Sequence, residues 1–194
     1  MLNVLNGQDL TIHNVEFLTP AAGYNVSKPN DQGSLTFKDA SGDFSGPAYE
    51  NDPNNRIHWT YTQPGLWTGA VSTEWWNSGN WDGGITPTAA INVLIPESAP
   101  NWPVLDVGTW ECNNLTIYGT LLIGSAHLTA YGDMEVNGTL ETSSGLGQLT
   151  VYGDMDWNPG AVADEAIFNI LVRGNWNFNE GSDVYVNARV YFEG

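Results

Sequence analysis

The chain has 194 residues and carries 22 acidic but only five basic side chains, so its formal net charge is −17. This balance argues against nucleic acid and anionic membrane surfaces as partners, because both attract clustered Lys and Arg; no apolar run is long enough to span a membrane. Short runs of branched and aromatic residues between Gly and Asn, without a sustained 3.6-residue period, predict an all-β fold.

The first part of the chain has the pattern of stacked strands. Leu10-Thr-Ile12 and Leu35-Thr-Phe37 repeat one motif, which indicates successive turns with long loops between them. We therefore predict that residues 1–63 are the terminal turns of a first β-helix module. Strand pattern follows Met1 directly, without a basic leader and an apolar run, so we expect an excerpt of a longer protein.

Four carboxylates are grouped in loop-like sequence of this first module: Asp39, Asp43, Glu50 and Asp52. Carboxylate oxygens are ligands that Ca²⁺ prefers, so these residues are a candidate calcium site, although their spacing matches no EF-hand. The alternative is an ordinary solvated acidic surface. Apart from this candidate Ca²⁺, the sequence indicates no required cofactor.

Residues 64–194 have a different composition and are predicted to form a Trp-rich opening segment followed by a second β-solenoid module. One arrangement of the two modules is a continuous rod. Trp75, Trp76 and Trp81 are candidates for a flat platform that binds sugar rings, with Asn77 and Asn80 supplying hydrogen bonds. The interpretation that we favour is a cap, in which these aromatic rings cover the open apolar end of the solenoid.

The second module contains a repeated phrase of ten residues. LTAYGDMEVN begins at residue 128, LTVYGDMDWN at 149 and ILVRGNWNFN at 170, a step of 21 residues each time. Such a period predicts a right-handed parallel β-helix, or β-solenoid, with turns of about 20 residues. We expect equivalent residues to stack inside it, with corners at the glycines: Leu128, Leu149 and Ile170; Met134, Met155 and Trp176; Gly132, Gly153 and Gly174.

A further copy of the phrase is suggested by Leu115-Thr-Ile117-Tyr-Gly119, which begins only 13 residues before Leu128. A shorter turn or a second strand must therefore lie between them. Two carboxylates recur at equivalent places of the first two full copies, and the third copy has asparagine at both places: Asp133, Asp154 and Asn175; Glu135, Asp156 and Asn177. This pattern favours an outer polar ladder over a catalytic pair.

Catalytic groups have no recognisable pattern in this sequence. Arg56 is the only basic residue near a cluster of acidic side chains, those of Glu50 and Asp52. One arginine beside two carboxylates usually forms a surface ion pair. The three His residues lack the spacing of metal ligands. Cys112 is the only cysteine and precedes a strand pattern (Cys112-Asn-Asn-Leu-Thr-Ile117), so we expect a small buried hydrophobe. We predict that the chain is not an enzyme.

Several short motifs resemble those of one protein group. Trp67-Thr-Gly69, Asn80-Trp81, Asn92-Val-Leu-Ile-Pro96 and Cys112-Asn-Asn-Leu-Thr-Ile117 are similar to a recurring segment of large secreted, β-helical, adhesin-like surface proteins of the Bacteroidota. The resemblance covers most of the chain and implies a β-helical fold at the cell surface or outside the cell. It implies no reaction.

The function that follows is a non-catalytic structural or adhesive segment of an extracellular surface protein, built as a rigid rod. Alternatives are a carbohydrate-binding module and a non-catalytic part of a β-helical enzyme that degrades polysaccharide. The expected partners are a polysaccharide or another cell-surface protein. We also expect end-to-end self-association through residues 185–194, where a final strand would expose unpaired backbone groups.

Overall fold

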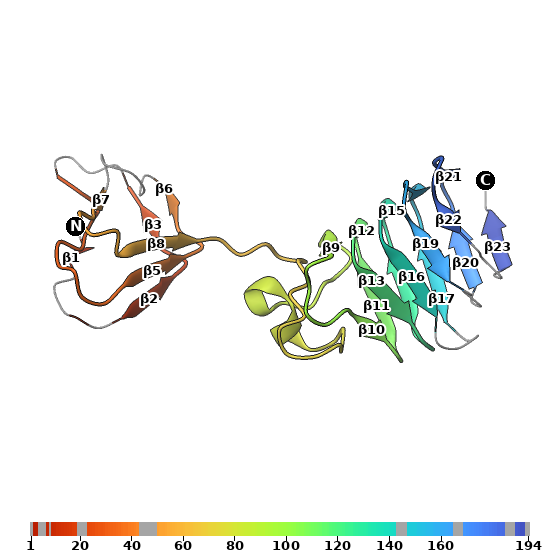
Figure 1. Cartoon of the computed structure of the whole chain (residues 1–194), viewed down its shortest axis with the longest axis horizontal. Coiled ribbons are helices and arrows are strands. Elements are labelled where there is room, and N and C mark those ends of the chain that lie inside the picture. The colour runs from red at the N-terminus through yellow and green to blue at the C-terminus, as the bar shows by residue number, and fades with distance from the viewer. Residues whose placement is uncertain are drawn as a thin grey trace. The chain divides into compact units, whose positions relative to one another are not determined.

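The computed structural model describes residues 2–3, 7, 9–18, 23–42, 50–142, 147–164, 169–184 and 189–192. Within these ranges the fold is all-β, and its named strands pair in parallel sheets. The exceptions are two single 3₁₀ turns, η1 (Ser78–Asn80) and η2 (Asp82–Gly84). The chain divides into two compact units, Met1–Thr62 and Gln63–Gly194, each of them a stack of β-solenoid turns (Figure 1).

Unit 1 stacks its turns in three small parallel sheets. Their strands are β1 (Leu2–Asn3), β4 (Val26–Ser27) and β7 (Glu50–Asn51); β2 (Leu10–His13), β5 (Leu35–Lys38) and β8 (Ile57–Thr60); and β3 (Glu16–Phe17) with β6 (Ser41–Gly42). Leu10 pairs with Leu35, as the repeated motif predicts, and Leu35 pairs with Ile57. Leu35, Phe37 and Ile57 are buried, so the inward residues of successive strands form this unit's core.

Unit 2 stacks its turns in three five-stranded parallel sheets, and each complete turn gives one strand to each sheet. The first sheet has β9 (Val93–Ile95), β12 (Leu115–Ile117), β15 (Met134–Val136), β18 (Met155–Trp157) and β21 (Trp176–Phe178). The second has β10 (Val104–Leu105), β13 (Thr120–Ile123), β16 (Thr139–Thr142), β19 (Val162–Asp164) and β22 (Asp183–Val184). The third has β11 (Thr109–Cys112), β14 (His127–Ala130), β17 (Gln148–Val151), β20 (Asn169–Val172) and β23 (Arg189–Phe192).

The stacking that the repeat predicts is confirmed. Leu149 pairs with Leu128 on one side and with Ile170 on the other, and all three are fully buried. Met155 likewise lies between Met134 and Trp176. The 21-residue step therefore corresponds to one turn of the solenoid. Alternation along each strand sends every second side chain into a continuous apolar interior.

The turn that begins with β12 is shorter than the 21-residue repeat, and its Leu115 motif is not the first strand of the repeated phrase. Leu115 pairs with Met134, whereas the partner of Leu128 is Trp110. The motif beginning at Leu115 therefore matches the second strand of the repeated phrase, and a second strand does intervene before Leu128. The ambiguity has a simple cause: the two strands share the same apolar–polar–apolar alternation, so composition alone cannot distinguish them.

The Trp-rich segment caps the first turn of unit 2. Leu66 and Glu74 form parallel bridges to Leu94 and Val104, which anchor the segment on that turn. Its three buried rings belong to the same apolar core as the solenoid interior: Trp67, Trp75 and Trp81. Figure 1 shows the segment beside β9 and β10. The expected cap is present with Trp67, Trp75 and Trp81 as its buried rings, whereas Trp76, which was expected to belong to it, is 58% exposed.

Side-chain oxygens also connect the turns at one corner of unit 2. Each of the first four members of a column accepts a hydrogen bond from the backbone N–H of the member in the next turn: Asn92, Asn114, Asp133 and Asp154, with Asn175 as the last donor. The distances lie between 2.7 and 3.2 Å. These bonds satisfy backbone donors that the strand ladder leaves unpaired where the chain turns. The predicted outer polar ladder is therefore present.

Asp154 gives this ladder a testable pH dependence. The Asn175 backbone N–H and side-chain amide both donate to Asp154 and hold the pKa of its carboxyl below the usual 3.8. Because the pKa of this carboxyl is lower in the folded chain than in the unfolded chain, the carboxylate stabilises the fold at pH values above about 4. This contribution is lost as the pH falls below about 4 and through the lowered pKa of the folded chain. Asp154→Asn keeps an acceptor oxygen, as Asn114 does in an earlier turn. We therefore expect the variant to lose less stability than the parent between pH 7 and pH 3, measured by urea unfolding at each pH. An equal loss in both proteins would contradict this role for Asp154.

Candidate ligand-binding surface

The Trp residues proposed for a sugar platform do not share one surface. Trp75 and Trp81 are 0% and 3% exposed, whereas Trp76 is 58% exposed. The open end of the solenoid accounts for this division, because covering it removes two large rings from water. A narrow hollow beside Trp76 measures only about 50 Å³, well below the roughly 300 Å³ at which small-molecule sites begin. The three rings therefore form no exposed platform.

The two asparagines beside these rings have internal partners. Asn80 is fully buried, and its Oδ1 accepts hydrogen bonds from the backbone N–H groups of Val71 and Ser72. Its Nδ2 donates to Ser72 Oγ and to the Glu74 carbonyl. Asn77 Oδ1 caps η1 by accepting from the Gly79 N–H. Asn80 therefore shapes the cap from within and has no free group for a ligand.

Two of the calcium candidates are engaged with other parts of unit 1. Asp39 Oδ1 accepts hydrogen bonds from the Thr62 N–H at 2.6 Å and the Thr62 hydroxyl at 2.7 Å. These bonds favour the charged carboxylate and lower the pKa of Asp39. Glu50 Oε2 accepts from the Trp59 indole N–H at 2.7 Å. The Asp39 carboxylate thus joins two successive turns, and the Glu50 carboxylate joins two strands, β7 and β8, of one turn.

Asp52 closes a local turn, because its two oxygens accept from the backbone N–H groups of Arg56 and Ile57, both at 2.7 Å. Asp43 lies outside the described residues. In the described part of the chain, no three His, Cys, Asp or Glu side chains gather closely enough to hold a metal ion. The three described members of the calcium candidate have separate structural contacts.

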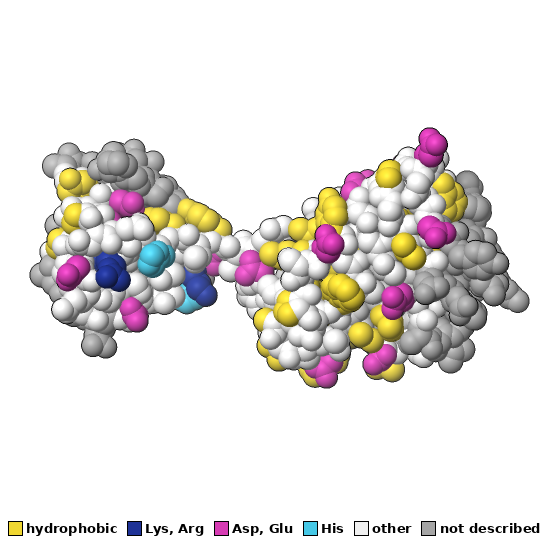
Figure 2. Space-filling view, in the orientation of Figure 1, with side chains coloured by type: hydrophobic (Ala, Val, Ile, Leu, Met, Phe, Trp, Pro, Cys, Tyr) yellow, Lys and Arg dark blue, Asp and Glu magenta, His cyan; other side chains and the backbone are white. Residues whose placement is uncertain are grey.

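Cys112 is buried as predicted, and burial raises the pKa of its thiol to about 12. The reactive thiolate is therefore a negligible fraction at neutral pH. On the face of unit 2 in Figure 2, acidic side chains are scattered instead of gathered in one patch. Neither feature indicates a reactive centre.

One column of exposed aromatic side chains follows the corner after β14 and β17. The rings of Tyr131 and Tyr152 stack with their centroids 5.2 Å apart, and the Arg173 guanidinium lies 4.5 Å from the Tyr152 centroid. The Tyr131 hydroxyl donates to the Glu111 carboxylate, whose charge raises the pKa of Tyr131. Because the faces of these rings are turned toward neighbouring turns, the column strengthens the stack and offers little open ring surface.

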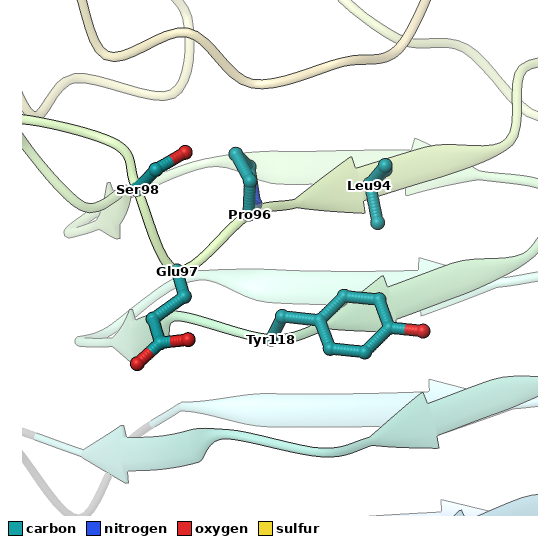
Figure 3. Close-up of a pocket in the computed structure, with 5 residues that line it drawn as sticks. All are labelled: Leu94, Pro96, Glu97, Ser98 and Tyr118. Carbon is teal, nitrogen blue, oxygen red and sulfur yellow. The ribbon is translucent and has the colours of Figure 1, made fainter.

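A different aromatic side chain, Tyr118, lies in a hollow on the outer side of the first two turns of unit 2. The hollow measures about 420 Å³, and we call it the Tyr118 hollow; it is lined by Leu94, Pro96, Glu97, Ser98 and Tyr118. Figure 3 shows the ring of Tyr118 broadside below Leu94 and Pro96, with the Glu97 carboxylate to one side. An apolar floor with a few polar groups at its edge is the usual composition of a small-molecule site.

The hollow is built where two strands end one above the other. Ile95 ends β9, and its carbonyl accepts hydrogen bonds from the backbone N–H groups of Tyr118 and Gly119, which follow β12. A Cβ at Gly119 would come within 2.9 Å of Trp102 Nε1 and 2.7 Å of the Pro96 carbonyl oxygen. The absence of a side chain at Gly119 thus allows the Pro96 loop to pack closely beside Tyr118.

No motif in the sequence predicts this hollow directly, although the repeat contains a signal for it. Later turns have asparagine at the position of Tyr118: Asn137, Asn158 and Asn179. Those amides form a ladder, with Asn158 Nδ2 donating to Asn137 Oδ1 and Asn179 Nδ2 to Asn158 Oδ1. Tyr118 departs from this ladder with a large ring that is 51% exposed.

Comparisons of the chain with protein-family models, with curated proteins and with solved structures gave no match. The described residues include no helix with the length and hydrophobicity needed to cross a membrane.

Proposed function

We propose that this chain is a non-catalytic structural segment of an extracellular surface protein, in which its solenoid turns space or display other parts. The observation that carries the proposal is the use of polar side chains in unit 2. The corner column from Asn92 to Asn175 and the amide ladder from Asn137 to Asn179 are directed along the stack, from turn to turn. Each turn of such a stack contacts only its neighbours, so these bonds help to hold one turn to the next.

The setting outside the cell is supported by the resemblance of the Trp-rich stretch and the first turn to segments of secreted surface proteins. The large negative charge is compatible with it, because like charges keep neighbouring molecules apart. The sugar platform of Trp75, Trp76 and Trp81 loses its basis, since two of these rings are buried.

Changing the number of turns tests the proposal. A spacer of stacked units should accept one more unit, so we expect duplication of residues 149–169 to add one turn, or about 4.8 Å, to unit 2. Thermal stability should be equal or higher, since each added turn contributes a new interface. Small-angle X-ray scattering and thermal unfolding measure the two effects.

The matched control duplicates only residues 149–158, which is half a turn and breaks the register of the strands behind it. This variant should be destabilised or fail to fold. A full-turn duplication as damaging as the half-turn one would contradict the modular spacer. Turnover of neutral or acidic polysaccharides by the parent chain that disappears in Arg56→Ala would contradict the non-catalytic assignment.

A further inference from the structure

We propose that the Tyr118 hollow binds a single ring of a neutral saccharide. The site would give the rod a weak glycan contact, separate from its structural role. It consists of the open ring face of Tyr118, the apolar side chains of Leu94 and Pro96, and the polar groups of Glu97 and Ser98. The apolar C–H face of a pyranose packs on an aromatic ring, while its hydroxyls need polar partners at the edge.

The ring of Tyr118 is available in a way that the rings of Tyr131 and Tyr152 are not. Tyr131 and Tyr152 are similarly exposed, at 44% and 42%, but they stack on each other. Tyr118 is 51% exposed and has no stacking partner among the described residues. Figure 3 shows its ring lying along the outer surface of the sheet. A ligand can therefore cover the ring without displacing a protein group.

The polar groups around the ring are also available. Within the described ranges, the Glu97 carboxylate, the Ser98 hydroxyl and the Tyr118 hydroxyl make no hydrogen bond to the protein. A carboxylate accepts from two sugar hydroxyls at once, and the hydroxyls of Ser98 and Tyr118 both donate and accept. Hydrogen bonds to a charged acceptor are roughly twice as strong as those between neutral groups. This set suits the vicinal hydroxyls of a hexose.

Charge selects a neutral ligand over an acidic one. The sequence has no Lys or Arg between Arg56 and Arg173, so the segment that builds the hollow has no basic side chain to balance a uronate or sulfate. Glu97 would repel such groups. A compact cation could use Glu97 and the ring face, but it would leave Leu94 and Pro96 uncovered. A pyranose ring covers the aromatic face and this apolar row together.

Packing gives no reason for tyrosine at this position. Half of the side chain is in water, and the equivalent residues of later turns are asparagines that bond to one another. Substitution at such an exposed position changes stability by only about 0.5 kcal/mol. Binding can therefore be tested without loss of the fold, which a thermal melt of each variant verifies.

Saturation-transfer difference NMR on the whole chain is the test, with cellohexaose, laminarihexaose and mannohexaose as neutral probes. We expect at least one of them to bind with a Kd on the order of 1 mM, as suits one shallow ring contact. Tyr118→Ala should weaken that binding at least about tenfold, a change of ~1.4 kcal/mol. Tyr131→Ala is the matched control and should bind as the parent does, because its ring lies in the stacked column.

Two further probes separate the sources of binding. A galacturonate hexamer should bind at least about tenfold more weakly than the best neutral probe, because Glu97 repels its carboxylates. Glu97→Gln should retain saccharide binding with a loss of a few-fold, since the amide still accepts hydrogen bonds.

Failure of all neutral probes at 10-fold the expected Kd of about 1 mM would overturn the proposal. Equal losses in Tyr118→Ala and Tyr131→Ala would also overturn it, as would tetramethylammonium binding that requires Glu97 in the absence of saccharide binding. None of these outcomes affects the turn-duplication test of the rod.

Discussion

Leu149→Ala is expected to lower the free energy of unfolding of unit 2 by about 2–5 kcal/mol, as for other fully buried leucines. Leu149 is completely buried between Leu128 and Ile170 in adjacent turns. Strands on both sides hold the backbone, so the neighbouring turns can collapse only partly into the space left by the side chain. Urea unfolding followed by circular dichroism measures the change.

The control for this substitution lies one position earlier in the same strand. Gln148 is exposed, and Gln148→Ala should stay within about 0.5 kcal/mol of the parent. The pair separates loss of interior packing from any general effect of alanine in β17. If Leu149→Ala were as mild as Gln148→Ala, the predicted stacking of the 21-residue repeat in the interior would be refuted.

Trp81→Ala is expected to cost about 3–5 kcal/mol, since it removes a large buried ring from the cap. The Trp81 ring packs edge-on against Trp67 and Trp75, with centroids 5.0 and 4.7 Å away. Its indole N–H donates to the Trp75 carbonyl at 2.8 Å. The variant therefore also leaves a buried acceptor without its partner, which adds to the loss of stability. Thermal and urea unfolding of unit 2 report the effect.

Trp76→Ala is the matched control, because Trp76 is a neighbouring tryptophan whose ring is mostly in water. We expect a change within about 0.5 kcal/mol. A small effect of Trp81→Ala together with loss of glycan binding would favour the sugar platform, whereas a large stability effect with unchanged glycan binding supports the cap. The two tryptophans thus distinguish the interpretations that the sequence left open.

A rod with one shallow saccharide contact would obtain useful avidity only through repetition. A single ring site on the order of 1 mM contributes about 4 kcal/mol. Several such sites on one chain, or on many chains at a surface, convert later binding events into intramolecular ones and strengthen attachment by orders of magnitude. The proposed spacer and the proposed glycan contact are therefore compatible functions of one segment.

Much of the fold is determined by the sequence alone. The three copies beginning at 128, 149 and 170 have one length and one alternation, so the stacking of Leu128, Leu149 and Ile170 follows from periodicity. The outer ladder follows from the same argument, because asparagine can replace aspartate wherever only an acceptor oxygen is needed. The sequence alone likewise shows that no Lys or Arg lies between Arg56 and Arg173, so this stretch has no basic side chain to bind an anionic ligand.

Only the tertiary structure decided which member of each ambiguous set faces the interior. Trp75 and Trp76 are adjacent and chemically identical, yet Trp75 is buried within the cap and Trp76 is mostly in water. The open end of the solenoid accommodates only a limited number of rings. The Leu115 motif resembled the start of a further copy of the phrase, and only its pairing with Met134 identified it as the second strand of the phrase. The Tyr118 hollow depends on the close stacking of Pro96 and Gly119 from different turns. Such contacts between residues distant in sequence leave no local pattern. Periodicity shows only the features that all turns share, whereas the hollow is formed at a turn that differs from the others.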